Sequence, residues 1–462
     1  MNIKRKVFFD PFTGIITDNE ALQGNGEGYL DIPPADDTIQ GFIFVLTTKC
    51  NLNCKYCYSI SQNPPASMAA DDPVKILQAQ VRPQAETLFI NFFGGEPTLE
   101  FETIKNTVEF VEKNYADKTA YFRITTNGTC SIEKLKYLVN NQFSIVISSD
   151  GVPDESSELI KQVVAKKTEK NIKYLVENHA VFRVRATLTT ENLSVLPQSL
   201  HYWKNLGVEH VHLEPYHPIG HSEEELKLLP DRKKFVDEFM KGIEVAEGLG
   251  LWIQTGAFMN LLTPSTYFCT GASGKFRVYN PDGSVSSCYR VQSFQNKNKF
   301  FLLDNWKKTV ESEGLYINPY AGKSSLLSHH SVYDFEKCKD CEAKFVCAGG
   351  CLIRNKEFGG NINIPDEWIC YVRRNLFKYG IIQTWEALSN GRIPVIFGRF
   401  LFENMVLLKT CVGNGKFKPE LILNDILKIE KDQKYYNLFN VLGIEKTHIP
   451  TYYQKISRAE CI

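Results

Sequence analysis

The sequence predicts an α/β protein in which a parallel sheet curls into a partial barrel, followed by a small cysteine-rich domain and a C-terminal extension. Six β-rich runs, separated by segments of helix length, lie between residues 41 and 255, and this alternation is typical of a parallel sheet. Short polar or glycine-containing motifs follow most of these runs. Ten of the thirteen cysteines fall into two groups, one directly after the first run and one beyond residue 256.

The predicted strands are nearly continuous apolar runs, as parallel strands covered on both faces are. They lie at 41–48, 87–93, 120–126, 143–149, 182–189 and 210–215. Helical patterns at 101–115, 156–177 and 223–248 supply crossovers, and right-handed crossovers would curl the sheet into an open or partial barrel. We therefore expect ligands at the carboxyl ends of the strands.

A chain of 462 residues is too long for one simple domain. We divide it into an N-terminal extension at 1–40, the barrel at 41–255, the cysteine-rich domain at 256–385 and a C-terminal extension at 386–462. The last segment has an amphipathic pattern near 400–409. It would form a cap, an interface or a binding element, or simply pack against the barrel.

Composition disfavours nucleic acids and membranes as partners. Lys plus Arg equals Asp plus Glu at 53 each, so no basic excess indicates nucleic acid or an anionic membrane surface. No run approaches the ~18 apolar residues of a membrane span, and the basic start of the chain lacks an apolar signal segment. We therefore expect a cytoplasmic protein with reduced thiols, in which clustered cysteines are metal ligands or catalysts.

The two cysteine groups have metal-ligand spacing. The first is Cys50, Cys54 and Cys57, and the second is Cys269, Cys288, Cys338, Cys341, Cys347, Cys351 and Cys370. Sulfur ligands select zinc or iron–sulfur clusters. Structural zinc requires four ligands, which would suit a knuckle at Cys338 and Cys341 but not three cysteines within eight residues. Three thiolates fit a four-iron cluster with one iron left open.

Four further motifs lie at the predicted carboxyl-end rim or on the fifth strand. They are Gly94-Gly95-Glu96-Pro97, Thr125-Thr126-Asn127-Gly128, Ser148-Ser149-Asp150-Gly151, and the pair Arg183 and Arg185. The first three each indicate a turn when taken alone. Their repeated placement at one rim predicts a ligand site.

With these motifs the chain resembles the radical S-adenosylmethionine (radical SAM) enzymes. Cys50-Asn-Leu-Asn-Cys54-Lys-Tyr-Cys57 fits their CxxxCxxC signature, including the aromatic Tyr56, and Gly-Gly-Glu-Pro follows the second strand. The resemblance implies a partial (β/α)6 barrel and one catalytic [4Fe–4S] cluster on the three cysteines. The open iron would bind S-adenosylmethionine, and one electron would cleave it to methionine and a 5′-deoxyadenosyl radical that abstracts hydrogen.

The resemblance also implies the contacts to S-adenosylmethionine. They are Tyr56, Gly94, Gly95, Glu96, Thr126, Asn127, Ser148 and Arg185. The glycines would let backbone carbonyls approach the methionine amine, assisted by Glu96. Arg185 would pair with the cofactor carboxylate, and an ordinary ion pair inside the barrel is the alternative.

The second cysteine group resembles the SPASM extension of one radical SAM subgroup. Cys269 and Cys288 flank Gly283 with thirteen and four intervening residues, and a CxxC-x5-C-x3-C run and a last cysteine follow. The family implies two auxiliary [4Fe–4S] clusters, one on Cys338, Cys341, Cys347 and Cys370 and one on Cys269, Cys288 and Cys351. Seven cysteines are one short of eight ligands. An open iron that binds a substrate thiolate and a non-cysteine ligand such as Asp are the two alternatives.

The chain resembles the peptide maturases of that group. The expected substrate is a precursor peptide, cysteine-containing in the thiolate hypothesis, and the expected reaction is an oxidative cross-link, with a thioether favoured over a carbon–carbon bond. The electron would come from an external donor such as flavodoxin or ferredoxin. The alternatives are an anaerobic sulfatase-maturing enzyme that forms formylglycine, and a non-enzymatic iron–sulfur carrier or structural zinc protein.

Some residues outside these sets have open roles. Asp150 would act as a general base, with a turn-capping role as the alternative. The histidines at 210, 212, 217 and 221 are expected to pack or to contact substrate, with a zinc site as the lesser alternative. Cys130 is expected to pack in the core.

Overall fold

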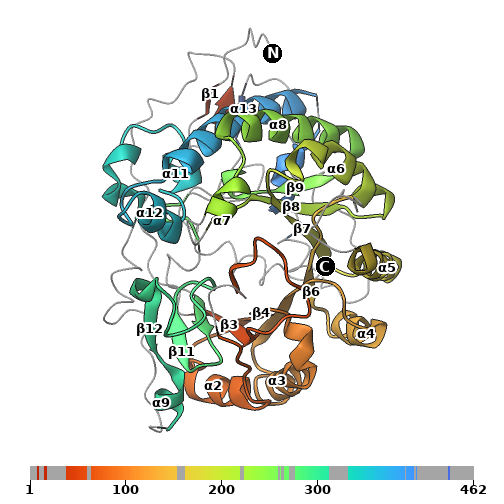
Figure 1. The fold of residues 1–462 in the computed structure, drawn as a ribbon, viewed down its shortest axis with the longest axis vertical. Helices are drawn as coiled ribbons and strands as arrows, with labels where there is room; N and C mark the ends of the chain where they lie inside the picture. Colours follow the sequence, from red (N-terminus) through yellow and green to blue (C-terminus); the bar gives the residue numbers. More distant parts are fainter. Residues whose placement is uncertain are drawn as a thin grey trace.

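A ten-stranded sheet forms the centre of the protein. The computed structural model describes residues 8–9, 15–17, 38–59, 64–152, 162–218, 223–258, 261, 265–269, 276–311, 331–390, 392–399, 402 and 435–437. The strand order is β12-β11-β10-β3-β4-β5-β6-β7-β8-β9. The sheet curves into an open arc with helices along its outer side (Figure 1). The fold is thus the expected α/β partial barrel.

The six predicted strands all form, and neighbouring strands in this part of the sheet run parallel. They are β3 Ile39–Thr47, β4 Thr87–Gly94, β5 Thr119–Thr126, β6 Ser144–Ser148, β7 Phe182–Leu188 and β8 His210–Pro215. Every bound lies within two residues of the prediction. All six carboxyl ends therefore meet at one rim, where the predicted motifs lie.

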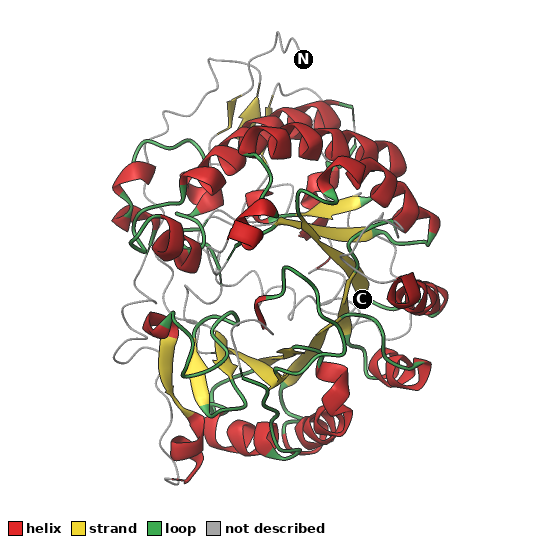
Figure 2. Ribbon diagram, in the orientation of Figure 1, coloured by secondary structure: helices red, strands yellow, loops and turns green. Residues whose placement is uncertain are grey.

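The helices alternate with these strands and cover the outer face (Figure 2). They are α2 Asp72–Gln80, α3 Phe101–Asn114, α4 Ile132–Asn140, α5 Gln162–Glu177, α6 Leu196–Asn205, α7 Glu223–Lys227 and α8 Arg232–Leu249. The helix predicted at 223–248 is two helices because Pro230 interrupts it. Asp231 then begins α8 as its N-cap, accepting hydrogen bonds from the backbone N–H groups of Lys233 and Lys234.

The two faces of the sheet differ in polarity. On β7, Val184, Ala186 and Leu188 join the main hydrophobic core under the helices, so Arg183 and Arg185 point to the concave face by strand alternation. The concave face of β3 is instead apolar, because Ile43 and Val45 form a small cluster of their own. The interior of the barrel is therefore polar along β7 and β8 and apolar along β3.

The sheet extends beyond the six predicted strands at both edges. β9 Trp252–Gln254 pairs parallel to β8, and β10 Phe276–Tyr279 pairs parallel to β3. β11 Ser284–Ser286 and β12 Leu302–Asn305 continue antiparallel from β10. The strands at 276–305 belong to the predicted cysteine-rich domain, so that domain and the barrel share one sheet.

The remaining helices of the cysteine-rich region pack beside the barrel. They are α9 Trp306–Glu311, α11 Lys344–Cys347, α12 Leu352–Phe358 and α13 Glu367–Ser389. α13 lies along α8 (Figure 1). A second hydrophobic cluster, which includes Val291, Phe335 and Phe345, forms the core of this region.

Short segments from the predicted N- and C-terminal extensions pair with each other. β1 Phe8–Phe9, β2 Ile15–Thr17 and β13 Tyr435–Asn437 form a three-stranded antiparallel sheet. The predicted N- and C-terminal extensions are therefore joined. Phe402 packs against the barrel, with its ring 5.5 Å from that of His210 and 4.4 Å from the Arg183 guanidinium carbon. The rest of the helix predicted at 400–409 lies outside the described residues.

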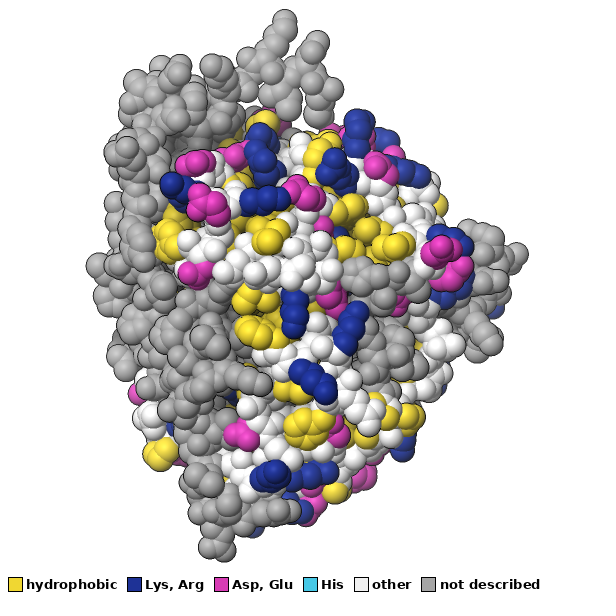
Figure 3. All heavy atoms as spheres, turned by 60° about the vertical axis from the view of Figure 1, so that its left-hand side comes forward, with side chains coloured by type: hydrophobic (Ala, Val, Ile, Leu, Met, Phe, Trp, Pro, Cys, Tyr) yellow, Lys and Arg dark blue, Asp and Glu magenta, His cyan; other side chains and the backbone are white. Residues whose placement is uncertain are grey.

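Two surface properties bear on partners. Among the described residues, no helix is long and apolar enough to cross a membrane. On the face shown in Figure 3, described Lys and Arg side chains are interspersed with Asp and Glu. This mixing agrees with the net charge of zero.

Candidate active site and cysteine sets

The first three cysteines lie on the loop that follows β3, which enters the concave side of the sheet (Figure 1). Cys50, Cys54 and Cys57 are partly exposed and form no disulfide among the described residues. Burial raises the pKa of Cys54 to about 12, and the nearby charges of Asp150, Cys57 and Cys50 add to the rise. The three thiols are thus gathered closely enough to influence one another, which fits three ligands of one cluster.

Gly95 and Glu96 hold this loop through backbone hydrogen bonds, and Gly94 and Gly95 leave room for it. Gly95 N–H donates to the Thr47 carbonyl at 2.7 Å, and Glu96 N–H donates to the Lys49 carbonyl at 2.9 Å. A Cβ on Gly94 would lie 2.1 Å from the Thr47 oxygen, and one on Gly95 would lie 2.2 Å from the Lys49 oxygen. The glycines admit the backbone of the cysteine loop itself, a role the sequence did not indicate. Their predicted approach to the methionine amine stays a prediction.

We expect Gly95→Ala to impair the site without unfolding the barrel. The added Cβ must displace the loop, and a shift of about 1 Å in the reacting groups costs roughly 100-fold in rate. Iron content and the rate of 5′-deoxyadenosine formation measure the effect. Gly248→Ala is the matched control, because its Cβ would meet no atom within 4 Å and helical alanine is more stable than glycine by ~0.5–1 kcal/mol. Wild-type iron content and rate in Gly95→Ala would contradict this role.

Glu96 joins the ends of β4 and β5. Its side chain is 1% exposed. One carboxylate oxygen accepts hydrogen bonds from the Thr126 hydroxyl at 2.8 Å and from Thr98, and the other accepts from Asn127 N–H at 2.7 Å. Burial raises the pKa of Glu96 although these hydrogen bonds oppose the rise. Glu96 and Thr126 therefore support the rim, and their predicted contacts with the cofactor stay predictions.

Asn127 connects the rim to the cysteine loop. Its side-chain N–H group donates to the Asn51 amide oxygen at 2.9 Å and lies 3.7 Å from Cys50 Sγ. Its amide oxygen accepts from the Thr129 hydroxyl at 2.7 Å. Asn127 thus lies beside one predicted cluster ligand, where a bound cofactor would also lie.

Tyr56 and Asp150, which the sequence assigned to separate roles, contact each other. The Tyr56 hydroxyl donates to one oxygen of Asp150, and Thr187 N–H donates to the other at 3.4 Å. Burial raises the pKa of Asp150 to about 6, against the opposing effects of these hydrogen bonds and of Arg185. The carboxylate is therefore held against the cysteine loop, with a pKa suited to accepting a proton near neutrality.

Ser148, Arg185 and His212 lie side by side on neighbouring strands, because Ser148 pairs with Arg185 and Arg185 with His212 in the sheet register. Arg185 Nε is buried and has no hydrogen-bond partner among the described residues. A buried guanidinium with an unsatisfied donor is costly. Arg185 therefore fits the predicted carboxylate contact.

The histidines do not gather into one site. His210 lies at the opposite end of the strand from the rim, against Phe402, and His212 Nε2 lies 2.8 Å from Glu214. His221 lies outside the described residues. Among the residues that are described, no three His, Cys, Asp or Glu side chains are close enough to hold one metal ion.

Four cysteines of the second group form a set that we call the distal set, made of Cys338, Cys341, Cys347 and Cys370. Burial raises the pKa of Cys338 to about 12, and the charges of Cys347, Cys370 and Cys341 raise it further. Cys370 lies in the first turn of α13, and Cys347 ends α11. Helix packing thus places these four cysteines near enough for their charges to interact, and their assignment to one cluster stays a prediction.

The other three form the proximal set, made of Cys269, Cys288 and Cys351. Burial raises the pKa of Cys288, and the charges of Cys351 and Cys269 add to the rise. Cys351 separates from Cys347 because the chain reverses between them: Ala348, Gly349 and Gly350 all have positive φ, at 47°, 73° and 81°. Such φ values favour glycine. This turn separates Cys347 from Cys351, and the division of the seven cysteines between two clusters stays a prediction.

The comparison with known families agrees with this geometry. Residues 44–202 match the family model of the radical SAM superfamily. Residues 44–202 therefore form a radical SAM domain. The matched range begins within β3 and includes the cysteine loop and the rim motifs of β4 to β7.

Several known proteins are similar to this chain beyond the radical SAM domain. The radical SAM cyclopropyl synthase TigE of Paramaledivibacter caminithermalis is 24% identical over 75% of this chain and 77% of its own length. A cysteine-type anaerobic sulfatase-maturating enzyme of Clostridium perfringens is 25% identical over 74% of this chain and 96% of its length. The solved structure of native anSMEcpe with bound AdoMet and Cp18Cys peptide has a TM-score of 0.61 at 19% identity, covering 76% of this chain and 99% of that one. The likeness to the solved structure shows that the shared fold extends past the barrel.

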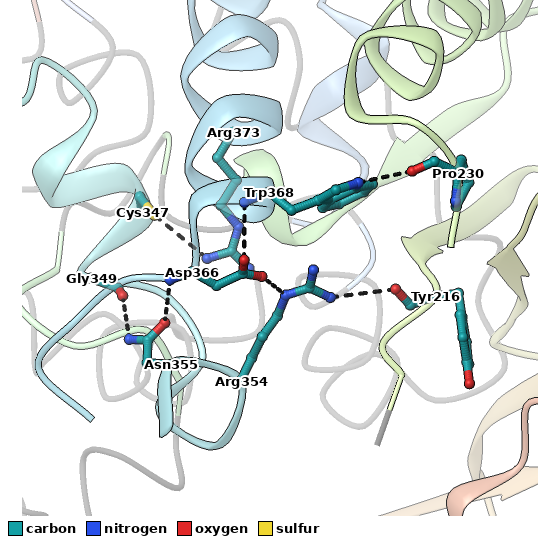
Figure 4. A network of polar contacts seen from close by, with 9 residues as sticks. All are labelled: Tyr216, Pro230, Cys347, Gly349, Arg354, Asn355, Asp366, Trp368 and Arg373. Carbon is teal, nitrogen blue, oxygen red and sulfur yellow. Dashed lines mark hydrogen bonds and ion pairs between the residues drawn. The ribbon is translucent and has the colours of Figure 1, made fainter. Parts of the chain in front are cut away.

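A buried polar network fastens the cysteine-rich region to the barrel (Figure 4). Arg354, 1% exposed in its side chain, forms an ion pair with Asp366 and donates to the Tyr216 carbonyl at 3.4 Å. Asp366 also accepts from Trp368 N–H at 2.9 Å, and the Trp368 indole donates to the Pro230 carbonyl at 2.9 Å. The network thereby ties the segments that carry Cys351 of the proximal set and Cys370 of the distal set to the end of β8 and the start of α8.

The sequence analysis missed several side chains that lie between the cysteine loop and the proximal set. The Arg290 guanidinium carbon lies 5.5 Å from the centre of the Tyr58 ring, and the Tyr58 and Tyr289 rings are 6.4 Å apart. The Tyr58 hydroxyl and Arg290 Nη1 are buried without a partner among the described residues. Their positions in the sequence could have indicated a place near the cysteines, since Tyr58 directly follows Cys57 and Arg290 lies two residues after Cys288. The sequence did not show that the two segments touch.

Proposed function

We propose that this chain is a radical SAM peptide maturase that forms an oxidative cross-link in a precursor peptide, with a thioether as the first candidate and a carbon–carbon bond as the second. The proposed cofactors are S-adenosylmethionine and three [4Fe–4S] clusters, one on the cysteine loop and one each on the distal and proximal sets. The proposed electron donor is a flavodoxin or ferredoxin. The relatives support a peptide substrate, because one solved neighbour holds a bound peptide.

One observation carries the thioether preference, namely that the proximal set has three cysteines. The eleven cysteines of the described residues, none of which forms a disulfide there, divide into three on the loop, four in the distal set, three in the proximal set and Cys130 in the core. A four-iron cluster on three cysteines offers an iron to a further ligand. A peptide thiolate is a suitable ligand, since iron sites bind deprotonated thiols. An oxygen ligand from this chain remains the alternative.

The chain's own residues would position the reactants. A bound cluster with S-adenosylmethionine supplies the hydrogen-abstracting 5′-deoxyadenosyl radical. Arg185 and Ser148 would orient the cofactor carboxylate, and Asn127 would hold its ribose or methionine beside Cys50. Asp150, oriented by Tyr56, would take the proton released when the new bond forms. The thioether would cost the peptide two hydrogens: the one on carbon would leave as an atom to the 5′-deoxyadenosyl radical, and the one on sulfur as a proton. A cluster held by Cys269, Cys288 and Cys351 would supply the acceptor for the one remaining electron.

A second candidate has a specific observation in its favour. The sulfatase-maturating enzyme is similar over nearly its whole length, which supports formylglycine formation from Cys or Ser. The non-enzymatic carrier has no such support, because the radical SAM domain is that of an enzyme superfamily. The test must therefore separate cross-linking from aldehyde formation.

Mass spectrometry of a cysteine-containing candidate peptide, incubated with reduced enzyme and S-adenosylmethionine, makes this separation. We expect the peptide to lose two hydrogens and to show no free thiol, and we expect its Cys→Ala counterpart to remain without a thioether. Loss of the sulfur with formation of an aldehyde would support the second candidate. Free thiol retained in the product, together with two lost hydrogens, would indicate a carbon–carbon bond and contradict the thioether.

A further inference from the structure

Arg373 occupies an unusual position between the cysteine sets. It lies on α13, three residues after Cys370, and is 3% exposed. Its Nη1 donates to Cys347 Sγ at 3.5 Å (Figure 4), and its guanidinium carbon lies 4.2 Å from the centre of the Phe268 ring. A buried cation thus contacts a ligand sulfur of the distal set directly.

Arg373 also approaches the proximal set and the barrel. A Cβ on Gly350, which precedes Cys351, would lie 3.3 Å from Nη1. A Cβ on Gly256 would lie 3.2 Å from both Arg373 Nη2 and Glu214 Oε2, and Gly256 N–H donates to Glu214 Oε1 at 2.7 Å. Arg373 therefore spans the space from the end of β8 to Cys347, with the Glu214 carboxylate at its barrel end.

The charges of Arg373, Glu214 and Arg185 influence one another. Burial alone would raise the pKa of Glu214, but its hydrogen bond with His212 and the nearby charges of Arg185 and Arg373 lower it. Glu214 is therefore a carboxylate that partly offsets the charge of Arg373. Because both groups lie in the interior, their charges are weakly screened compared with surface charges.

A cation and an N–H donor at a ligand sulfur favour the reduced, more negative form of an iron–sulfur cluster. Hydrogen bonds to the sulfurs and local charge are among the main determinants of cluster reduction potential. We propose that Arg373 is a positioning residue that raises the reduction potential of the cluster on the distal set, with Glu214 acting against it. This inference rests on the proposed function, since it requires a cluster on those four cysteines.

The test is a potentiometric titration of the reconstituted full-length protein, followed by electron paramagnetic resonance of the distal cluster. We expect Arg373→Gln to lower its midpoint potential and Glu214→Gln to raise it. Arg373→Lys keeps the charge but loses the planar donor, so its midpoint should fall between those of wild type and Arg373→Gln. Opposite shifts in two variants would not follow from a merely structural role.

Lys337→Gln is the matched control. Lys337 precedes Cys338, so this substitution removes the same charge beside the same cysteine set. The Lys337 side chain is 53% exposed and pairs with Glu367 at the surface, so water screens its charge. An unchanged midpoint in Arg373→Gln, or an equal shift in Lys337→Gln, would overturn the proposal. If Arg373→Gln does not fold, the proposal is tested by the other two variants: Arg373→Lys should lower the midpoint potential and Glu214→Gln should raise it.

Failure of the proposed function gives a different result. Wild-type protein with three clusters holds about twelve iron atoms. A reconstituted wild-type protein with about four or eight, and without the signal of a distal cluster, would overturn the cofactor content and the Arg373 inference together. Full iron content with no effect of Arg373 overturns the inference alone.

Discussion

Cys54→Ala is expected to abolish the reductive cleavage of S-adenosylmethionine while the rest of the protein stays folded. Cys54 lies on the loop after β3, its thiol coupled to those of Cys50 and Cys57. Two remaining cysteines cannot retain a cluster that requires three, so the iron content should fall by about four atoms. The auxiliary cysteine sets lie on other segments and should keep their iron. Iron analysis and the formation of 5′-deoxyadenosine measure both effects.

Cys130→Ala is the control for this prediction. Cys130 is a free cysteine of the same domain, 8% exposed and part of the main hydrophobic core. Removing one buried sulfur atom should cost about 1 kcal/mol of stability, with iron content and cleavage unchanged. Cleavage by Cys54→Ala at the rate of Cys130→Ala would refute the assignment of the loop as the catalytic cluster site.

Arg354→Met is expected to have the largest effect on stability. The Arg354–Asp366 ion pair is buried, with side chains 1% and 6% exposed. Removing one partner of such a pair leaves an uncompensated charge and costs about 3–5 kcal/mol. The substitution also removes the hydrogen bond to the Tyr216 carbonyl, which ties the cysteine-rich region to β8. Denaturant unfolding monitored by circular dichroism measures the loss.

The double variant Arg354→Met, Asp366→Asn tests the cause. Asn keeps an N-cap acceptor for Trp368 N–H but removes the buried charge. The double variant should therefore be more stable than Arg354→Met alone. Asp71→Asn is a surface control, because the Asp71–Lys75 pair is 61% and 46% exposed and such pairs contribute about 0–1 kcal/mol. A cost for Arg354→Met no larger than that of the control would contradict a structural role for the buried pair.

The elements predicted best are those whose signals are local. The apolar runs of β3 to β8 each contain enough β-branched and aromatic residues to specify a strand, and their bounds agree with the structure within two residues. The pairing of β10 with β3 was not predicted, because β10 has only four residues and joins an edge more than 200 positions away in the chain. The pairing of β2 with β13 was not predicted either, because it joins the two predicted terminal extensions.

The candidate site divides in the same way. The spacing of Cys50, Cys54 and Cys57 is a local property, and so is the left-handed turn at 348–350 that separates Cys347 from Cys351. The contact of Tyr56 with Asp150 joins positions 94 residues apart. No pattern in either segment indicates that contact, so the sequence assigned the two residues to separate roles.

The sequence by itself therefore determined the strands, the rim motifs and the cysteine spacing, because each depends on residues close together in the chain. Only the tertiary structure decided what the motifs support. Gly94 and Gly95 admit the cysteine loop, Glu96 fastens two strand ends, and Arg373 lies between the two auxiliary cysteine sets. These roles arise where strands and helices distant in sequence pack together, since a side chain's partners are set by packing and not by its neighbours in the chain.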